Sequence, residues 1–126
     1  MNKETIFSQK APDAIGPYSQ AIKCGNMLFI SGQLPVDKET GLMPLDIKLQ
    51  TKQSLENIKH IIAAAGYSMK DIVKTTVFVK DLGQFQDIND VYSTYFPNNP
   101  PARACIEVAE LPKGAGVEIE VIACAD

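Results

Sequence analysis

The chain has 126 residues, of which 45% are hydrophobic and 21% charged, and its formal net charge is −3. This size and apolar content are typical of one folded domain, residues 1–126, with its own core. A net negative charge argues against a surface for nucleic acid or for an anionic membrane. The sequence has neither a leader-like start nor an apolar run long enough to span a membrane, so we expect a soluble cytoplasmic protein.

The cysteines and the histidine bear on redox chemistry and metal binding. Cys24, Cys105 and Cys124 lie far apart and form no Cys-x-x-Cys pair. This spacing argues against a disulfide framework and a zinc site, and it favours a reducing compartment. His60 is the only histidine, so we expect no metal site and no Ser-His-Asp arrangement. The sequence does not indicate what Cys24 and Cys124 do.

The first half of the chain predicts three strands followed by a helix. Gly25-Asn26 is a hairpin turn signal, Gly41 lies in a proline-containing loop, and Gly66 marks a helix end. Alternating and helical apolar patterns predict strands at 5–7, 18–22 and 27–33, a loop at 34–46 and a helix at 47–65.

The second half predicts a strand, a helix and two more strands. Residues 71–80 are rich in β-branched side chains, which favours a strand. Asp81 stands where a helix N-cap is expected, and Pro97 closes that helix. Residues 117–124 alternate as the final strand. The order of elements predicts an α+β fold, a single mixed sheet with both helices packed on one face.

The stretch Pro101–Glu107 carries the only arginine of the chain, Arg103. A guanidinium at the start of a strand can bind a carboxylate through two parallel hydrogen bonds. A structural salt bridge to a nearby glutamate is the alternative. Alternation predicts Ala104, Ile106 and Val108 toward the helices.

We expect the last two strands to pair as a hairpin through residues 112–116. That pairing would place one charged and partly apolar face in the open, formed by Arg103, Cys105, Glu107, Glu118 and Glu120. Water alone is a poor partner for such a face, so the pattern favours association with other subunits, with the charged groups lining a cleft.

Several motifs together resemble the signatures of the reactive intermediate deaminase (Rid) family, also labelled the YjgF or L-PSP endoribonuclease family. The match runs in order along the chain, in AIGPYSQ at 14–20, SGQLP at 31–35, VFVKDL at 77–82, PARACIEV at 101–108 and VEIE at 117–120. Arg103 is similar to the arginine of the deaminase-competent branch. The resemblance implies a chorismate-mutase-like fold, a homotrimer with active sites between subunits, and no cofactor.

The same resemblance implies an activity in amino-acid metabolism. The family hydrolyses reactive 2-imino acids, 2-iminobutanoate and 2-iminopropanoate, to 2-keto acids and ammonia. Arg103 would bind the substrate carboxylate, and Glu118 would orient water and move a proton; charge balance for Arg103 is the alternative role of Glu118. The other pocket positions that match the family are Tyr18, Ser31, Gly32, Asn89 and Cys105.

Two other functions remain open from the sequence. A regulatory module could sense a keto or imino acid in the Arg103 cleft without turnover. An endoribonuclease is suggested by a family label, against which stand a sequence pI of about 5.1 and the lack of a histidine pair. The preferred imino acid and the physiological pathway are not readable from the sequence.

Overall fold

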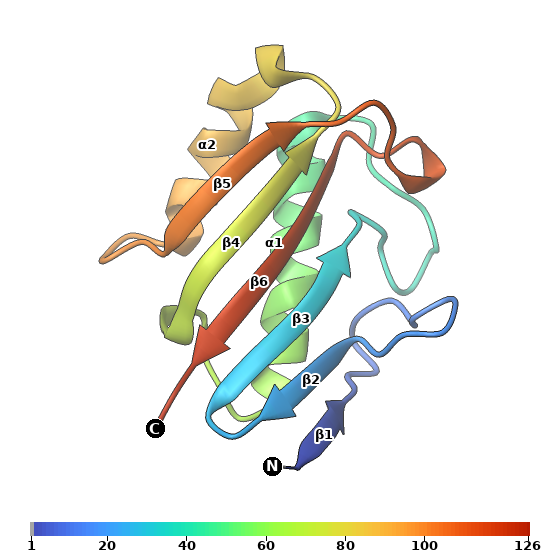
Figure 1. Ribbon diagram of the computed structural model, residues 1–126. Helices are drawn as coiled ribbons and strands as arrows, with labels where there is room; N and C mark the ends of the chain where they lie inside the picture. Colours follow the sequence, from blue (N-terminus) through green and yellow to red (C-terminus); the bar gives the residue numbers. More distant parts are fainter. Residues whose placement is uncertain (1) are drawn as a thin grey trace.

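The computed structural model describes residues 2–126 as one layer of strands and one layer of helices (Figure 1). Both helices lie behind the sheet, on the same face, as predicted. The strands are β1 (Lys3–Ile6), β2 (Ala21–Cys24), β3 (Met27–Gln33), β4 (Ile72–Val79), β5 (Ala102–Glu107) and β6 (Val117–Cys124), and the helices are α1 (Ile47–Ala64) and α2 (Phe85–Tyr95). The predicted α+β class is confirmed.

The six strands form one mixed sheet in the order β1-β2-β3-β6-β4-β5. Neighbours pair antiparallel except β4 and β5, which are parallel. The predicted hairpin of β5 with β6 is therefore wrong, because β4 lies between them. Helix α2 supplies the crossover that a parallel β4–β5 pair requires.

Helix α1 follows the sequence pattern closely. The Asp46 side chain accepts a hydrogen bond from the backbone N–H of Leu49 at 3.0 Å, which caps the first turn. Gly66 follows the helix with φ of 80°, a conformation that glycine adopts without strain. Leu55 and Ile58 are fully buried on the face toward the sheet.

Several boundaries differ from the prediction, among them that of the first strand, expected at residues 5–7 and found at Lys3–Ile6. A short 3₁₀ turn, Leu82–Gln84, precedes α2, with Asp81 accepting from the backbone N–H of Gly83 at 2.8 Å. Strand β2 begins at Ala21, so Tyr18 belongs to the preceding loop.

The core lies between the helices and the inner face of the sheet. Strand β6 supplies the centre of that face, because Val117, Ile119 and Ala123 are fully buried and alternate with more exposed residues. Among residues 2–126, neither helix is long and apolar enough to cross a membrane.

Candidate functional site

Glu118 projects from the middle of the sheet, on the face away from the helices. Its neighbours Val117 and Ile119 point into the core and are fully buried, so the side chain between them points to the opposite face. Its cross-strand partner on β4 is Phe78. Glu118 therefore lies on the open face of the sheet.

A bulge in β3 brings backbone against this carboxylate. Ile30 pairs with Val121 but Gln33 pairs with Ile119, so β3 has one extra residue at Ser31-Gly32. A Cβ atom built on Gly32 would lie 2.6 Å from Glu118 Oε2. Because Gly32 has no side chain, the Glu118 carboxylate can occupy the space beside it.

The surroundings of Glu118 favour its protonated form. Burial raises the pKa of this carboxyl above its ordinary value, and the negative charge of Glu120 raises the pKa further. A raised pKa brings a carboxyl closer to the range in which it can both accept and return a proton.

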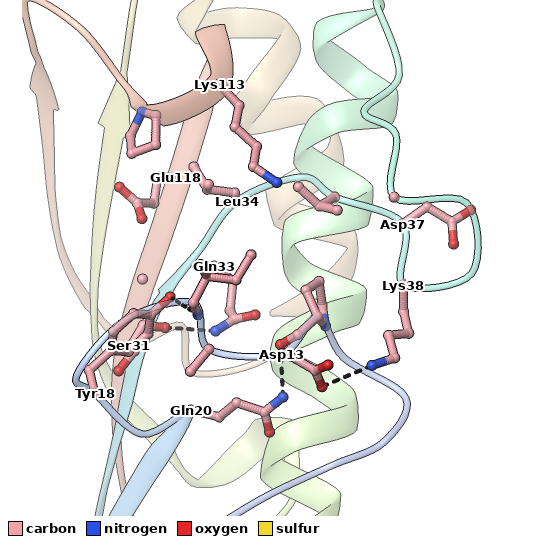
Figure 2. A pocket seen from close by; sticks show the side chains of 17 residues that line it. Asp13, Tyr18, Gln20, Ser31, Gln33, Leu34, Asp37, Lys38, Lys113 and Glu118 are labelled. Atoms are coloured by element: carbon pink, nitrogen blue, oxygen red, sulfur yellow. Dashed lines mark hydrogen bonds and ion pairs between the residues drawn. The ribbon is translucent and has the colours of Figure 1, made fainter.

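A cleft of about 750 Å³ opens beside Glu118 (Figure 2). Glu118, Ser31 and Gly32 line one end of it, and Tyr18 stands over that end from the 12–18 loop. Tyr18 is 53% exposed, and its hydroxyl accepts from the backbone N–H of Ile15 at 3.4 Å. The space is larger than a four-carbon imino acid needs.

Gln20 holds the loop that carries Tyr18. This amide is buried, accepts from the backbone N–H of Ser8 at 2.7 Å and donates to the carbonyl oxygen of Pro12 at 2.8 Å. The Ser31 hydroxyl donates to the carbonyl oxygen of Ser19 at 2.7 Å. Because its proton is used there, the remaining capacity of Ser31 toward a ligand is as an acceptor.

Arg103 lies at the far edge of the sheet, against α2. Its cross-strand partner Thr75 is fully buried and shares a 2.8 Å hydrogen bond with the hydroxyl of Tyr92 on α2. The guanidinium carbon stands 4.8 Å from the ring centroid of Tyr92 and 5.3 Å from that of Phe85. These rings hold the cation by cation–π contact.

The guanidinium remains available to an anion. Its Nη1 donates to Asn89 Oδ1 at 2.7 Å, and among residues 2–126 no carboxylate oxygen comes within 4.0 Å of it. The alternative of a salt bridge to a nearby glutamate is therefore not seen in the described part of the chain. Cys105, two residues on, packs against the core, and burial raises the pKa of its thiol although the charge of Arg103 opposes this.

The seven predicted site residues fall into two groups. The predicted common face for Arg103 and Glu118 is wrong, because Arg103 faces the helices and Glu118 faces away from them. Ala104 and Ile106 accordingly face the open side, the reverse of the prediction, in register with Thr76 and Phe78. One group, at the cleft, is Tyr18, Ser31, Gly32 and Glu118; the other, beside α2, is Arg103, Asn89 and Cys105.

Several cleft residues were not predicted. Lys113 lines the cleft from the 112–114 turn with φ of 60°, and its side chain extends toward Leu34 (Figure 2). Lys38 and Asp13 form an ion pair of 2.9 Å that ties two cleft-lining loops together. Only the turn predicted at residues 112–116 pointed toward any of them. No group of three or more metal-ligating side chains is found among residues 2–126.

Known proteins are similar to this chain over nearly its whole length. The sequence pattern of the family described as Endoribonuclease L-PSP matches residues 8–125. A RutC family protein of Pyrococcus horikoshii is 56% identical over 122 residues, 96% of this chain and 97% of the relative. A protein of Escherichia coli named 2-iminobutanoate/2-iminopropanoate deaminase is 51% identical over 123 residues, 95% of this chain and 96% of the relative.

Solved structures of other proteins also match this chain in fold and sequence. The crystal structure of Escherichia coli TdcF with bound serine has a TM-score of 0.95 at 48% identity, covering 98% of this chain and 99% of that one. The crystal structure of the YjgF gene product of Escherichia coli also has a TM-score of 0.95, at 49% identity, covering 98% and 99%. With identities of this level across almost every residue, the chain belongs to the YjgF/Rid family, the Endoribonuclease L-PSP family of the matched pattern.

Proposed function

We propose that this protein hydrolyses reactive 2-imino acids, 2-iminobutanoate and 2-iminopropanoate among them, to 2-keto acids and ammonia. The observation that carries the proposal is an arginine with no carboxylate partner in the described chain, together with a carboxyl of raised pKa in a cleft. Relatives about 51% identical are named for this activity. We propose that this pair of groups acts on the carboxylate of the substrate and on its adjacent C=N carbon.

The chemistry needs one cation and one proton carrier. The Arg103 guanidinium binds the substrate carboxylate, which fixes the adjacent C=N carbon. Glu118 accepts a proton from a water molecule as the water oxygen bonds to that carbon. The same carboxyl then returns the proton to the imine nitrogen. As the carbon–nitrogen bond of the resulting aminoalcohol breaks, its hydroxyl proton passes to the leaving nitrogen, giving a keto acid and ammonia, so one water is consumed for each ammonia released.

The two groups meet, in this proposal, across a subunit boundary. Within one chain they lie on opposite faces of the sheet, so a single subunit cannot place both on one small substrate. A homotrimer in which Arg103 of one subunit approaches the Glu118 cleft of the next would complete three sites. Light scattering should then give a mass near 41 kDa for a chain of 13.7 kDa, about three times the monomer.

The test follows keto acid and ammonia released when a dehydratase generates the imine from threonine. Arg103→Ala should lower kcat/KM roughly thirtyfold to several-thousandfold, the range for removing one member of a buried charge pair. Glu118→Gln should lower kcat while the trimer persists, because an amide does not move a proton at neutral pH. Wild-type turnover in a normally melting Arg103→Ala protein would contradict the mechanism.

Mixed assemblies test the shared site directly. When Arg103→Ala and Glu118→Gln subunits are unfolded and reassembled together in equal amounts, about one interface in four combines both wild-type groups. Activity should therefore recover to about a quarter of the wild-type value. A site contained in one chain would recover nothing.

The same assay separates the alternatives. A sensing module would bind a keto acid with Arg103 but release no ammonia. An endoribonuclease would cleave RNA when purified free of contaminating nuclease, and would lose that cleavage in the Arg103→Ala variant. We propose the hydrolase because the carboxyl of raised pKa gives the cleft a group able to move a proton.

A further inference from the structure

Gln50 lies in the first turn of α1, and its side-chain amide makes one hydrogen bond as a donor and one as an acceptor. Its Nε2 donates to the carbonyl oxygen of Pro44 at 2.8 Å, and its Oε1 accepts from the backbone N–H of Gly116 at 2.9 Å. The side chain is only 8% exposed, so little water competes for either hydrogen bond. Gln50 therefore joins the 34–46 loop to the turn that precedes β6.

Gly116 has no room to move at this junction. A Cβ atom built on it would lie 2.9 Å from Gln50 Oε1 and 2.9 Å from Ile47 Cδ1. On its other side the carbonyl oxygen of Gly116 accepts from the backbone N–H of Lys80 at 3.0 Å, at the end of β4. The backbone is thus fixed through both of its polar groups directly before β6 begins.

This fixed point lies two residues before Glu118. The same turn carries Lys113, and the 34–46 loop supplies Leu34, Val36 and Asp37 to the cleft. Gln50 itself is not among the residues that line the cleft. A single buried amide outside the cleft therefore connects two of its walls to the start of the strand that carries the carboxyl.

We infer that Gln50 is a positioning residue for Glu118, an inference that rests on the proposed hydrolysis. By holding Gly116, it sets how far β6 enters the cleft and thus how closely the Glu118 carboxyl sits against Gly32. Loss of the Gln50–Gly116 hydrogen bond lets water reach the Glu118 carboxyl and moves this carboxyl away from the imine carbon.

The test compares Gln50→Met, which loses both hydrogen bonds, with Gln50→Glu, which keeps the acceptor for Gly116 and loses the donor to Pro44. We expect Gln50→Met to lower kcat about tenfold, as displacement of a catalytic group by a fraction of an ångström does, with little change in KM. Gln50→Glu should restore most of kcat. Gly116→Ala, whose methyl displaces the same hydrogen bond, should resemble Gln50→Met.

The control is Thr51→Val, next in the helix. Thr51 is fully buried and donates only within α1, to the carbonyl oxygen of Ile47 at 2.8 Å. This variant should melt earlier but keep kcat at 25 °C. If Thr51→Val loses as much kcat as Gln50→Met, general loosening of the helix explains both results and the inference is wrong.

A readout that needs no turnover separates this inference from the proposed function. NMR titration of the Glu118 carboxyl should show a lower pKa in Gln50→Met and Gly116→Ala than in the wild type, because solvation of the carboxylate increases. An unchanged titration in both folded variants would overturn the positioning role. A wild-type protein that releases no ammonia would overturn the proposed function, and the titration would still decide whether Gln50 positions Glu118.

Discussion

Substitution of Gly32 by alanine tests the cleft with a single methyl group. The backbone at Gly32 is outside the left-handed region, so an alanine there meets no backbone strain. Its Cβ would, however, lie 2.6 Å from Glu118 Oε2 and 2.9 Å from Glu118 Cδ. A carbon–oxygen contact needs about 3.4 Å, so the carboxylate oxygen must withdraw by roughly 0.8 Å.

A shift of this size should change turnover more than folding. Misplacement of a catalytic group by about 1 Å can cost on the order of a hundredfold in rate. We therefore expect Gly32→Ala to lower kcat about 10- to 100-fold. KM should change little, because in the proposed mechanism Arg103 still binds the substrate carboxylate. The free energy of unfolding should fall by less than about 1 kcal/mol, since the end of a partly exposed side chain can move aside.

The measurement is the steady-state release of 2-ketobutanoate from imine generated in place. Gly83→Ala is the matched control: its Cβ would lie 2.9 Å from Asp81 Oδ1, a comparable crowding of a carboxylate that does not line the cleft. That variant should keep wild-type kcat. Wild-type kcat in Gly32→Ala, at unchanged oligomer mass, would refute the idea that the contact with Gly32 sets the position of the Glu118 carboxylate.

Three further predictions concern charge and buried polar contacts. Glu120→Gln removes a negative charge that raises the pKa of Glu118. In the proposed mechanism the ionised form of Glu118 accepts the proton, so the acidic limb of the kcat profile should move to lower pH. An unmoved limb would argue against Glu118 as the base. Arg103→Lys should recover only part of the kcat/KM lost in Arg103→Ala, because an ammonium keeps the charge but loses the planar fork. Full recovery would mean that charge alone suffices. Tyr92→Phe leaves the buried Thr75 hydroxyl without its partner at 2.8 Å. The free energy of unfolding, measured by urea denaturation, should therefore fall by about 1–3 kcal/mol. No loss would indicate that another group satisfies Thr75.

The helices could be predicted well from the sequence because their signals are local. Apolar spacing and Gly66 gave α1 to within a residue, since each of these acts within one or two turns. Strand partners are harder to predict, because strands pair through residues that lie far apart in the sequence. A helix between two strands favours parallel pairing of those strands, and that signal between β4 and β5 was available. The hairpin prediction overlooked it.

The faces of β5 could not be predicted from alternation alone. The side with Ala104 and Ile106 is the more apolar one, so hydrophobicity predicts that side toward the helices, whereas Arg103 and Cys105 lie there instead. The choice depends on the Tyr92 ring, which lies under the guanidinium. Residues of the cleft at the 34–46 loop were missed for a related reason. Their positions depend on buried amides of α1, whose hydrogen bonds to loop carbonyls leave no periodic pattern in the sequence.

The place of β6 in the sheet has a consequence for synthesis of the protein. This strand pairs with β3 on one side and β4 on the other, yet it follows both in the sequence. Met27 meets its partner Cys124 across most of the chain, so contact formation here is slow compared with that of a local hairpin. Until β6 leaves the ribosome, the facing edges of β3 and β4 have no partner and are open to other strands. The nascent chain is therefore open to pairing with strands of other chains until β6 takes its place, and the Glu118 end of the cleft forms only then.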